Sequence, residues 1–343
     1  MNPADFSEEM LAGQRLLAGF DGEEFNEDLR YLIEELQVAG IVLFSRNLAG
    51  PDDIRRLCAE AQACAAAAGL PPLIVAMDQE GGTVARLAEP FTRFPGSDHI
   101  HEDSQADRFA AITAVELAHI GVNMNLAPVL DVAGTCARSI MKARAFPGGP
   151  AAVARLGARV IDGLQQAGIM AVAKHFPGIG RTTVDSHRDQ PELDANPEVL
   201  AATDMLPFET AIAHNVAGIM LSHILYTYLD DRFPASLSAP IARDLLRDKL
   251  GFAGVVMTDD LDMGAIAKHY DLDTVVDCLV AAEVDLALVC SRSPARQQAR
   301  DGFLRTIRSS AAGRETSVAA VGRVLDLKKQ YLGWQQTPDA SSR

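Results

Sequence analysis

Short uninterrupted apolar runs alternate along the chain with longer amphipathic stretches. The runs lie at residues 40–44, 73–77, 122–128, 169–173, 217–222, 254–258 and 284–289. A run of this length without polar alternation is typical of a strand that is buried on both faces of a parallel sheet. The stretches between the runs carry apolar residues at helical spacing, so the pattern predicts alternating strands and helices.

Helices are expected over residues 8–38, 51–68, 105–119, 151–166, 198–214, 238–249, 272–282, 294–311 and 315–330. In the first of these, Leu29, Leu32 and Leu36 recur on one helical face, and acidic residues fill the other face. Pro207 interrupts the helix over 198–214, so we expect a kink or break there.

Parallel strands that end in polar residues favour a (β/α)8 barrel of the TIM type over an open sheet. Only seven strands are visible in the pattern, so we expect the eighth to be short or irregular, or the barrel to be imperfect. No linker or low-complexity tract divides the chain. We therefore expect one catalytic barrel domain over residues 1–335 and a disordered polar tail over residues 336–343.

Composition and charge exclude some functions. Among 343 residues, 48% are hydrophobic and the net charge is -15, which argues against nucleic acid or an anionic membrane as partner. Five cysteines, an odd number without a CxxC pair, fit buried free thiols in a reducing compartment. The first residues show no secretory signal, and the apolar runs are too short or too broken to cross a bilayer. We expect a cytoplasmic protein.

Polar residues follow most of the predicted strands. They are Arg46, Asn47, Asp78, Glu80, Asp131, Lys174, His175, His223, Asp259 and Asp260, with the apolar Pro128 preceding Asp131. In a barrel the carboxyl ends of the strands meet at one mouth, so these groups are expected to converge. Charged side chains of this kind bind sugar hydroxyls through charge-assisted hydrogen bonds. The residue types therefore indicate a sugar site.

Two features suggest glycosidic bond cleavage. Asp259 can attack an anomeric carbon, and His187, oriented by Asp185, can give and take a proton near neutral pH. Other interpretations stay open on the residues alone. Asp259 and Asp260 could cap a helix or polarise a substrate acetamido group that attacks in their place, and His187 could bond only within its own loop.

Four motifs, in this order along the chain, resemble the family 3 glycoside hydrolases, and specifically their single-domain bacterial β-N-acetylglucosaminidases. The motifs are Asp78-Gln-Glu-Gly-Gly-x-Val-x-Arg86, Lys174-His-Phe-Pro-Gly-x-Gly, Asp185-Ser-His187 and Thr258-Asp-Asp-Leu-x-Met263. The resemblance covers the chain from about Gly13 to Val289. It implies retaining hydrolysis of terminal β-linked N-acetylglucosamine without a metal or other cofactor, and it favours the covalent mechanism.

The resemblance also implies roles for individual residues. It places the nucleophile on Asp259 and the acid/base on His187, supported by Asp185. The sugar-binding residues would be Asp78, Arg86, Arg144, Lys174 and His175, with Arg144 carried by the short match Ala143-Arg-Ala-Phe146. In such relatives the substrate is a cell-wall fragment, N-acetylglucosamine linked to a muramic acid. The expected partner is this carbohydrate alone, and the chain is expected to be a monomer or weak homodimer.

Two segments depart from the family pattern. Gly178-Ile-Gly-Arg181 stands where the family has Gly-His-Gly-Asp, and Pro147-Gly-Gly-Pro150 replaces an Asp-Pro pair. Two further functions stay open: sugar binding without turnover, suggested by the first departure, and a metal-dependent barrel hydrolase. The metal ligands of the latter would be His99, His101, Lys174, His223 and Asp259.

Overall fold

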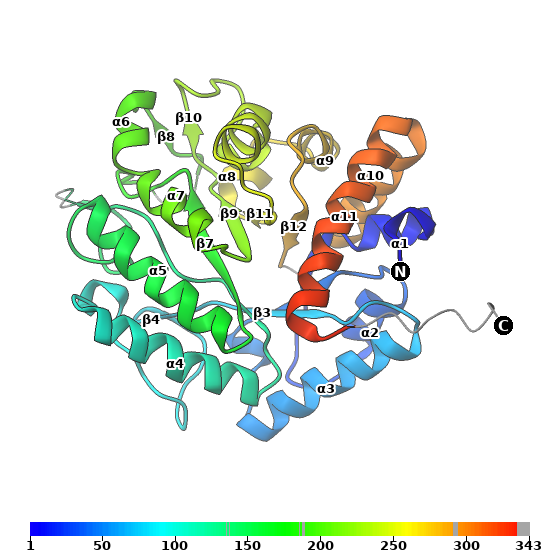
Figure 1. Cartoon of the computed structure of the whole chain (residues 1–343). Helices are drawn as coiled ribbons and strands as arrows, with labels where there is room; N and C mark the ends of the chain where they lie inside the picture. The colour runs from blue at the N-terminus through cyan, green and yellow to red at the C-terminus, as the bar shows by residue number, and fades with distance from the viewer. Residues whose placement is uncertain (135, 137, 185, 187–188, 291–293, 335–343) are drawn as a thin grey trace.

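Eight parallel strands close into a barrel in the computed structural model (Figure 1). The structure describes residues 1–134, 136, 138–184, 186, 189–290 and 294–334. Around the barrel the strand order is β1-β12-β11-β9-β7-β6-β3-β2. The strands are β1 Leu16–Gly19, β2 Gly40–Leu43, β3 Ile74–Met77, β6 Met124–Asn125, β7 Met170–Phe176, β9 Gly218–Leu221, β11 Val255–Asp260 and β12 Leu286–Val289. The (β/α)8 barrel is therefore confirmed; the tail expected over 336–343 lies outside the described residues.

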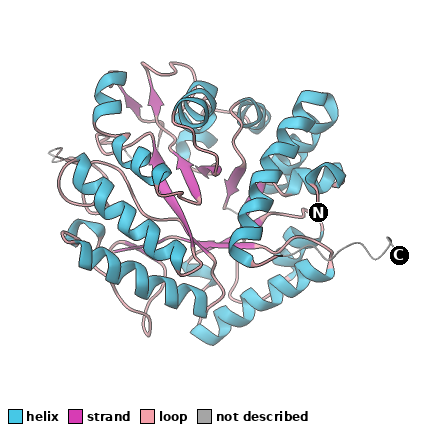
Figure 2. Cartoon of the chain, in the orientation of Figure 1, coloured by secondary structure: helices cyan, strands magenta, loops and turns pink. Residues whose placement is uncertain are grey.

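Helices surround the barrel (Figure 2). They are α1 Glu8–Gly13, α2 Glu27–Glu34, α3 Pro51–Ala67, α4 Asp103–His119, α5 Pro150–Gln166, α6 Pro197–Ala202, α7 Leu206–Ala213, η5 Pro240–Lys249 of π type, α8 Gly264–Ala267, α9 Leu272–Ala281, α10 Ala295–Ser309 and α11 Ala311–Leu332. Pro207 lies in the first turn of α7, so the expected break is confirmed. Within the described part of the chain, no helix has both the length and the apolar character of a membrane span.

Several short helices and strands lie before or between the barrel strands and helices. They are the 3-10 helices η1 Pro3–Asp5, η2 Ser45–Asn47, η3 Ser97–His99 and η4 Ala235–Leu237, and the strands β4 Gln79–Gly81, β5 Val84–Ala85, β8 Glu192–Leu193 and β10 Leu225–Tyr226. β4 and β5 form an antiparallel pair directly after β3. This pair matters for function because it carries residues from the first family motif.

The eighth strand, β1, lies inside the stretch that the sequence pattern assigns to one helix over residues 8–38. That assignment is wrong, because the stretch forms α1, β1 and α2. Leucine and alanine of β1 are good helix formers, but parallel pairing with β2 and β12 overrides this local preference. A side chain at Gly19 would meet the Cys290 carbonyl at 2.4 Å, so the seam where the barrel closes requires glycine.

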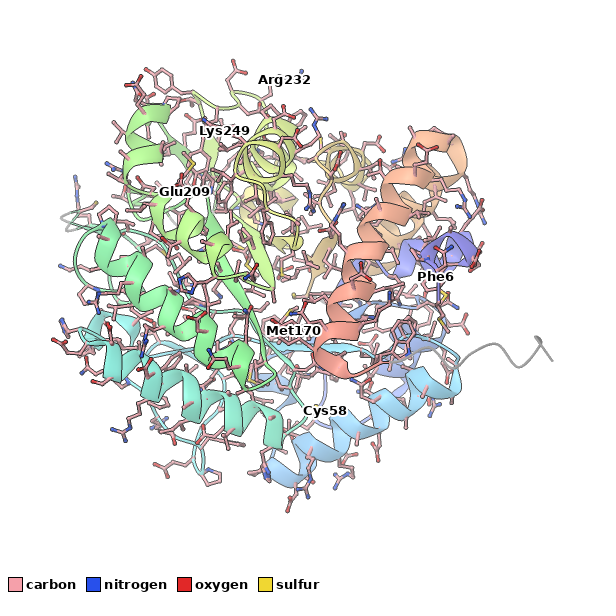
Figure 3. All side chains as sticks on the ribbon, viewed as in Figure 1. Phe6, Cys58, Met170, Glu209, Arg232 and Lys249 are labelled. Atoms are coloured by element: carbon pink, nitrogen blue, oxygen red, sulfur yellow. The ribbon has the colours of Figure 1, made fainter. Side chains whose placement is uncertain are left out.

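Two apolar clusters hold the fold together. One fills the barrel and includes Leu17, Met170 and Met257; the other lies between the strands and the surrounding helices. Met170 is fully buried near the barrel axis, whereas exposed charged side chains such as Glu209 lie at the periphery (Figure 3). Leu327 of α11 packs against the barrel cluster. α11, red in Figure 1, therefore covers the amino-terminal end of the barrel and leaves the carboxyl end for the site.

The cysteines are free thiols, as expected. Cys58 and Cys290 are buried, and Cys64, Cys136 and Cys278 are partly buried. Burial raises the pKa of Cys58 to about 12, so this thiol stays protonated at neutral pH and acts as a small apolar side chain.

Candidate active site

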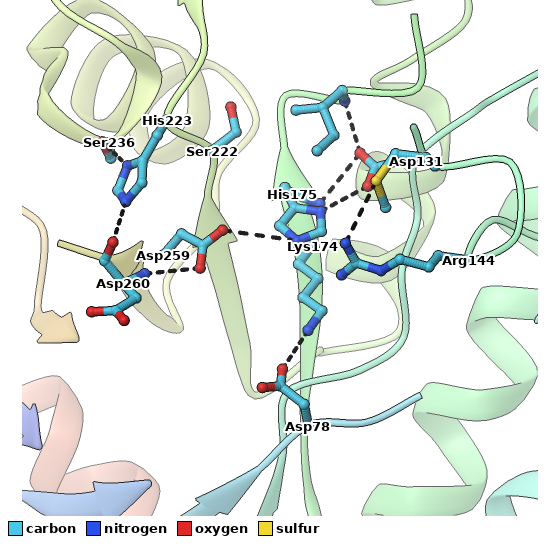
Figure 4. Close-up of polar contacts among 12 residues, drawn as sticks. Asp78, Asp131, Arg144, Lys174, His175, Ser222, His223, Ser236, Asp259 and Asp260 are labelled. Atoms are coloured by element: carbon cyan, nitrogen blue, oxygen red, sulfur yellow. Dashed lines mark hydrogen bonds and ion pairs between the residues drawn. The ribbon is translucent and has the colours of Figure 1, made fainter. Parts of the chain in front are cut away.

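The polar side chains at the carboxyl ends of β3, β7 and β11 converge (Figure 4). Asp78 directly follows β3. Lys174 and His175 are among the last residues of β7, and Asp259 lies near the end of β11. A shift in register between β7 and β9 after Lys174 interrupts the regular alternation of the strand, and both Lys174 and His175 contact site residues. The barrel thus assembles groups that are far apart in the sequence.

Five charged side chains form one network at this mouth. Lys174 Nζ donates to Asp78 Oδ1 at 2.7 Å and lies 2.6 Å from Glu80 Oε1. Arg86 Nη2 donates to the other oxygen of Asp78 at 3.0 Å. Arg144 binds Glu80 with two parallel bonds of 2.9 and 2.8 Å. We call these residues the mouth cluster; Glu80 was not among the expected binding residues, although Asp-x-Glu before a glycine pair was a visible signal.

Every member of the mouth cluster with a resolved shift is held in its charged form. Burial raises the pKa of Asp78, but the charges of Lys174 and Arg86 outweigh it and bring that pKa far below the usual range. The pKa of Glu80 is likewise lowered. Burial lowers the pKa of Lys174, yet the two carboxylates leave it raised overall, and the pKa of Arg144 is raised as well. The site therefore offers fixed charges to a ligand.

Parts of this network remain accessible. The side chains of Asp78, Arg86 and Arg144 are 15%, 26% and 22% exposed, whereas those of Lys174 and Glu80 are almost fully buried. The exposed carboxylate can accept from ligand hydroxyls, and the two guanidinium groups can donate to them. Lys174 holds Asp78, and Glu80 holds Arg144.

His175 lies between Asp131 and Asp259. Its Nδ1 lies 2.7 Å from Asp131 Oδ2, and Asp131 is fully buried. Asp131 is acceptor-only when ionised, so Nδ1 carries a hydrogen and the ring is fixed in orientation. The other nitrogen, Nε2, lies 4.0 Å from Asp259 Oδ2. Asp131 was visible as a polar residue after a strand, but nothing in the sequence paired it with His175.

Asp259 is ionised and partly exposed. Its Oδ1 accepts the backbone N–H of Asp260 at 2.8 Å, and its side chain is 22% exposed. Burial raises the pKa of Asp259, but the charges of His175 and His223 and the N–H of Asp260 outweigh it, so the pKa is lowered overall. A charged and partly exposed carboxylate is the form required for nucleophilic attack.

The remaining expected site residues divide into two groups. Asp185 and His187 lie outside the described residues. Arg46 and Asn47 were expected to lie with the groups that bind sugar hydroxyls. In the structure both donate to the backbone carbonyl of Phe20, at 3.0 Å each. Arg46 also donates to the Cys290 carbonyl at 2.6 Å. These side chains therefore join the segments that follow β1, β2 and β12.

The segment that departs from the family pattern is packed into the base of the site. Ile179 is buried, and its N–H donates to Asp131 Oδ1 at 2.8 Å. A side chain at Gly180 would meet the Val132 carbonyl at 2.2 Å, which explains the glycine. Arg181 pairs with buried Asp204 through Nε at 2.9 Å. Ile179 and His175 therefore bind the same carboxylate, while Arg181 is held by a different one.

The five residues considered as metal ligands do not come together. His99 is largely exposed and pairs with Asp98 at 2.9 Å. Lys174 is engaged by carboxylates, and His223 contacts Ser236. Over the residues that the structure describes, no group of three or more His, Cys, Asp or Glu side chains is placed to hold a metal ion.

Comparison with known proteins gives one consistent result. Residues 9–327 match the model of the glycosyl hydrolase family 3 N terminal domain. The beta-hexosaminidase of Alkalilimnicola ehrlichii is 34% identical over 295 residues, which cover 83% of each chain. The beta-hexosaminidase of Idiomarina loihiensis is 31% identical over 331 residues, covering 94% of this chain and 98% of that protein.

Solved structures agree with the sequence matches. The family 3 β-N-acetylglucosaminidase of Paenibacillus sp. superposes with a TM-score of 0.90 at 36% identity, over 98% of this chain. This chain covers only 65% of that longer protein. NagZ from Neisseria gonorrhoeae superposes with a TM-score of 0.77 at 26% identity, over 90% of this chain and 97% of that one.

Proposed function

We propose that this chain, which belongs to glycosyl hydrolase family 3 and is a glycoside hydrolase, removes a terminal β-linked N-acetylglucosamine and retains the configuration of the sugar. Its relatives support the choice of sugar, since they are beta-hexosaminidases and a β-N-acetylglucosaminidase. One observation carries the reaction type: an ionised and partly exposed Asp259 lies at the carboxyl end of the barrel, 4.0 Å from His175 Nε2. The steps below follow from these groups.

Sugar binding is assigned to Asp78, Arg86, Arg144, Lys174 and His175. Asp78 accepts from sugar hydroxyls, and the exposed parts of Arg86 and Arg144 donate to sugar oxygens. Lys174 holds Asp78 at 2.7 Å and so fixes the carboxylate that the sugar meets. Because these charges are positioned before substrate arrives, the sugar is oriented without rearrangement of the site.

In the first chemical step Asp259 attacks the anomeric carbon. A bond forms between its carboxylate oxygen and that carbon, the bond to the departing oxygen breaks, and that oxygen takes a proton from His187. In the second step His187 takes a proton from water, water displaces Asp259, and the sugar leaves with its original configuration. Asp185 orients the imidazole. The roles of His187 and Asp185 rest on the motif Asp185-Ser-His187.

The direction of the neighbouring carboxylate favours this covalent mechanism over attack by the substrate acetamido group. The latter uses paired carboxylates that both face the acetamido group. Here Asp260 Oδ1 accepts the N–H groups of Asp262 and Cys290, each at 3.1 Å. Asp260 is therefore engaged by the backbone through Oδ1, whereas Oδ2 of Asp259 lies toward His175, at 4.0 Å from Nε2.

We extend the proposal to the setting of the reaction. The substrate would be a peptidoglycan fragment in which N-acetylglucosamine is linked to a muramic acid, and the reaction would take place in the cytoplasm. One catalytic domain over residues 1–335 would act as a monomer or weak homodimer.

The decisive experiment is Asp259→Ala assayed with an aryl β-N-acetylglucosaminide. We expect turnover to fall by about 10⁴-fold or more, because the covalent step is lost, with unchanged circular dichroism. Added azide should restore aryl release and give an α-glycosyl azide, because it attacks from the side that Asp259 vacates. A fluorinated N-acetylglucosaminyl fluoride should label Asp259 in the unsubstituted enzyme.

Asp273→Ala on α9 is the matched control, since this carboxylate is 77% exposed on the outer surface. It should behave as the unsubstituted enzyme. Near-normal turnover by Asp259→Ala would refute the assignment of the nucleophile, and sugar binding without turnover by the unsubstituted chain would refute the enzyme reaction itself.

A further inference from the structure

The strand that carries the proposed nucleophile is irregular at that residue. β11 pairs with β12 through Met257 with Leu286 and then Asp260 with Leu288, so three steps along β11 match two along β12. Pairing between β11 and β9 ends at Thr258. Such a bulge re-aims a side chain and leaves backbone groups without ladder partners. Asp259 therefore lies on a segment that the sheet alone does not hold.

Side chains replace the lost ladder bonds along β12. The hydroxyl of Thr258 accepts the N–H of Leu288 at 3.0 Å. Asp260 Oδ1 accepts the N–H of Cys290 at 3.1 Å, and the N–H of Leu261 donates to the Leu288 carbonyl at 2.9 Å. The residue after the nucleophile is thus fixed through its side chain on the β12 side.

On the side of β9, the side chain that binds the residue after the nucleophile is His223. Its Nε2 lies 3.0 Å from the carbonyl oxygen of Asp260, and its Nδ1 lies 2.7 Å from Ser236 Oγ (Figure 4). His223 and Ser236 are both fully buried. A carbonyl oxygen only accepts, so Nε2 must carry the hydrogen and donate it. Ser236 then holds the ring from its far side.

We propose that His223, held by Ser236, is a positioning residue for the nucleophile Asp259. By binding the Asp260 carbonyl, His223 fixes the residue whose N–H holds Asp259 Oδ1 at 2.8 Å. The bond replaces sheet pairing where β11 has left β9, and it keeps the attacking oxygen aimed at the anomeric carbon. The proposal deepens the proposed function and rests on Asp259 being the nucleophile.

The physical consequence is a loss of rate without a loss of sugar binding. A displacement of about 1 Å at a reacting group costs roughly 10²-fold in rate. The mouth cluster lies on β3, β7 and the segments beside them, and its hydrogen bonds join its own members: Arg86 to Asp78, Arg144 to Glu80 and Lys174 to Asp78. Affinity for the sugar and the rate of attack should therefore separate when His223 is changed.

The test compares His223→Leu with His223→Gln. Leucine cannot donate to the Asp260 carbonyl, whereas the glutamine amide can reach a position close to that of Nε2. We expect kcat/KM for an aryl β-N-acetylglucosaminide to fall by about 10²-fold in the leucine variant and to recover to within about 10-fold of the unsubstituted enzyme in the glutamine variant. The Kd for N-acetylglucosamine, measured by calorimetry, should stay within about 3-fold in both.

The leaving group gives a second readout. A variant of the acid catalyst, such as His187→Ala, should regain much of its rate on a dinitrophenyl glycoside, because a good leaving group needs no proton. His223→Leu should remain about 10²-fold impaired on the same substrate, because attack by Asp259 is still required. His214→Leu, at a half-exposed histidine paired with Asp162, is the control and should be unchanged.

Two results would overturn the proposal. One is an unchanged kcat/KM in His223→Leu; the other is an equal loss of rate and of N-acetylglucosamine binding in both His223 variants, as a merely structural residue would give. If the leucine variant does not fold, Ser236→Ala replaces it, with an expected fall of about 10-fold and an unchanged Kd. Activity in Asp259→Ala would instead refute the nucleophile, whatever His223 does.

Discussion

Two buried charge clusters lie at opposite ends of the barrel. At the carboxyl end, Asp78 of the mouth cluster accepts from Lys174 at 2.7 Å and Arg86 at 3.0 Å. At the amino end, Asp285 accepts from Arg247 at 2.6 Å and Arg323 at 2.8 Å. Each aspartate thus holds two cations with almost the same geometry. We call Asp285, Arg15, Arg247 and Arg323 the floor cluster.

The two clusters differ in what else their members touch. Asp285 is fully buried, and its Oδ2 also accepts the N–H of Val256 in β11. Arg15 donates to the backbone carbonyls of Asp285 and Val284, and to Ser317 of α11. The floor cluster therefore ties α11 to the start of β12. The mouth cluster keeps three partly exposed side chains, so similar chemistry stabilises the fold at one end and meets ligand at the other.

The largest expected effect is that of Asp78→Asn at the mouth. The amide cannot replace a carboxylate that accepts from sugar hydroxyls, and we expect kcat/KM to fall by about 10³-fold, or about 4 kcal/mol of transition-state stabilisation. Lys174 keeps its contact with Glu80 at 2.6 Å, so the free energy of unfolding should fall by less than about 3 kcal/mol, the typical cost of breaking a buried ion pair. Steady-state kinetics and urea unfolding measure the two quantities, and a stability loss without a rate loss would contradict the comparison.

Asp285→Asn is the matched change at the floor. Here the almost buried Arg247 and the partly exposed Arg323 lose the counter-charge of fully buried Asp285. Breaking a buried ion pair typically costs about 3 kcal/mol. We expect the free energy of unfolding to fall by about that amount, while kcat/KM of the folded enzyme at 25 °C stays within about 2-fold. Urea unfolding followed by circular dichroism gives the first quantity. A large rate loss in a stable Asp285→Asn variant would show that the floor also supports the reaction.

The mouth and the floor also differ in how far they could be predicted from sequence. The seven strands expected from apolar runs all occur in the barrel, because a continuous buried run needs no distant information. β1 was not predicted, because Leu16 and Leu17 have a helical preference that only pairing with β2 and β12 overrides. The periodicity of a local segment carries no information about a partner strand such as β12, which is more than 250 residues away in the sequence.

For the site, the motifs predicted which residues converge at the mouth but not their supporting partners. Asp78, Lys174 and Asp259 follow strands, so their convergence could be expected from the fold. The contacts of His175 with Asp131 and of His223 with Asp260 depend on side-chain directions across different loops. The floor cluster had no sequence signal, since Arg15 and Asp285 are 270 residues apart.

Lys328 at the floor gives the smallest expected effect and the one with a pH signature. Its Nζ donates to Gln14 Oε1 at 3.0 Å, and burial lowers its pKa to about 7. In the unfolded chain the amine has its usual pKa of about 10.4, so between pH 7 and 10.4 the unfolded state binds more protons. Stability attributable to this group therefore rises with pH across that window, and the full penalty remains below pH 7.

Lys328→Met removes the buried charge and leaves Gln14 without this donor. We expect a net gain of about 2 kcal/mol in the free energy of unfolding at pH 6, and little or no gain at pH 10, where the native lysine is already neutral. The difference between the urea-unfolding curves of the two proteins isolates Lys328 from every other titrating group. Lys329→Met, at a neighbouring half-exposed lysine paired with Asp326, is the control and should give no pH-dependent difference. A gain that is constant from pH 6 to pH 10 would mean that packing, not charge, sets the cost of Lys328, and that only the arginines at the floor act through electrostatics.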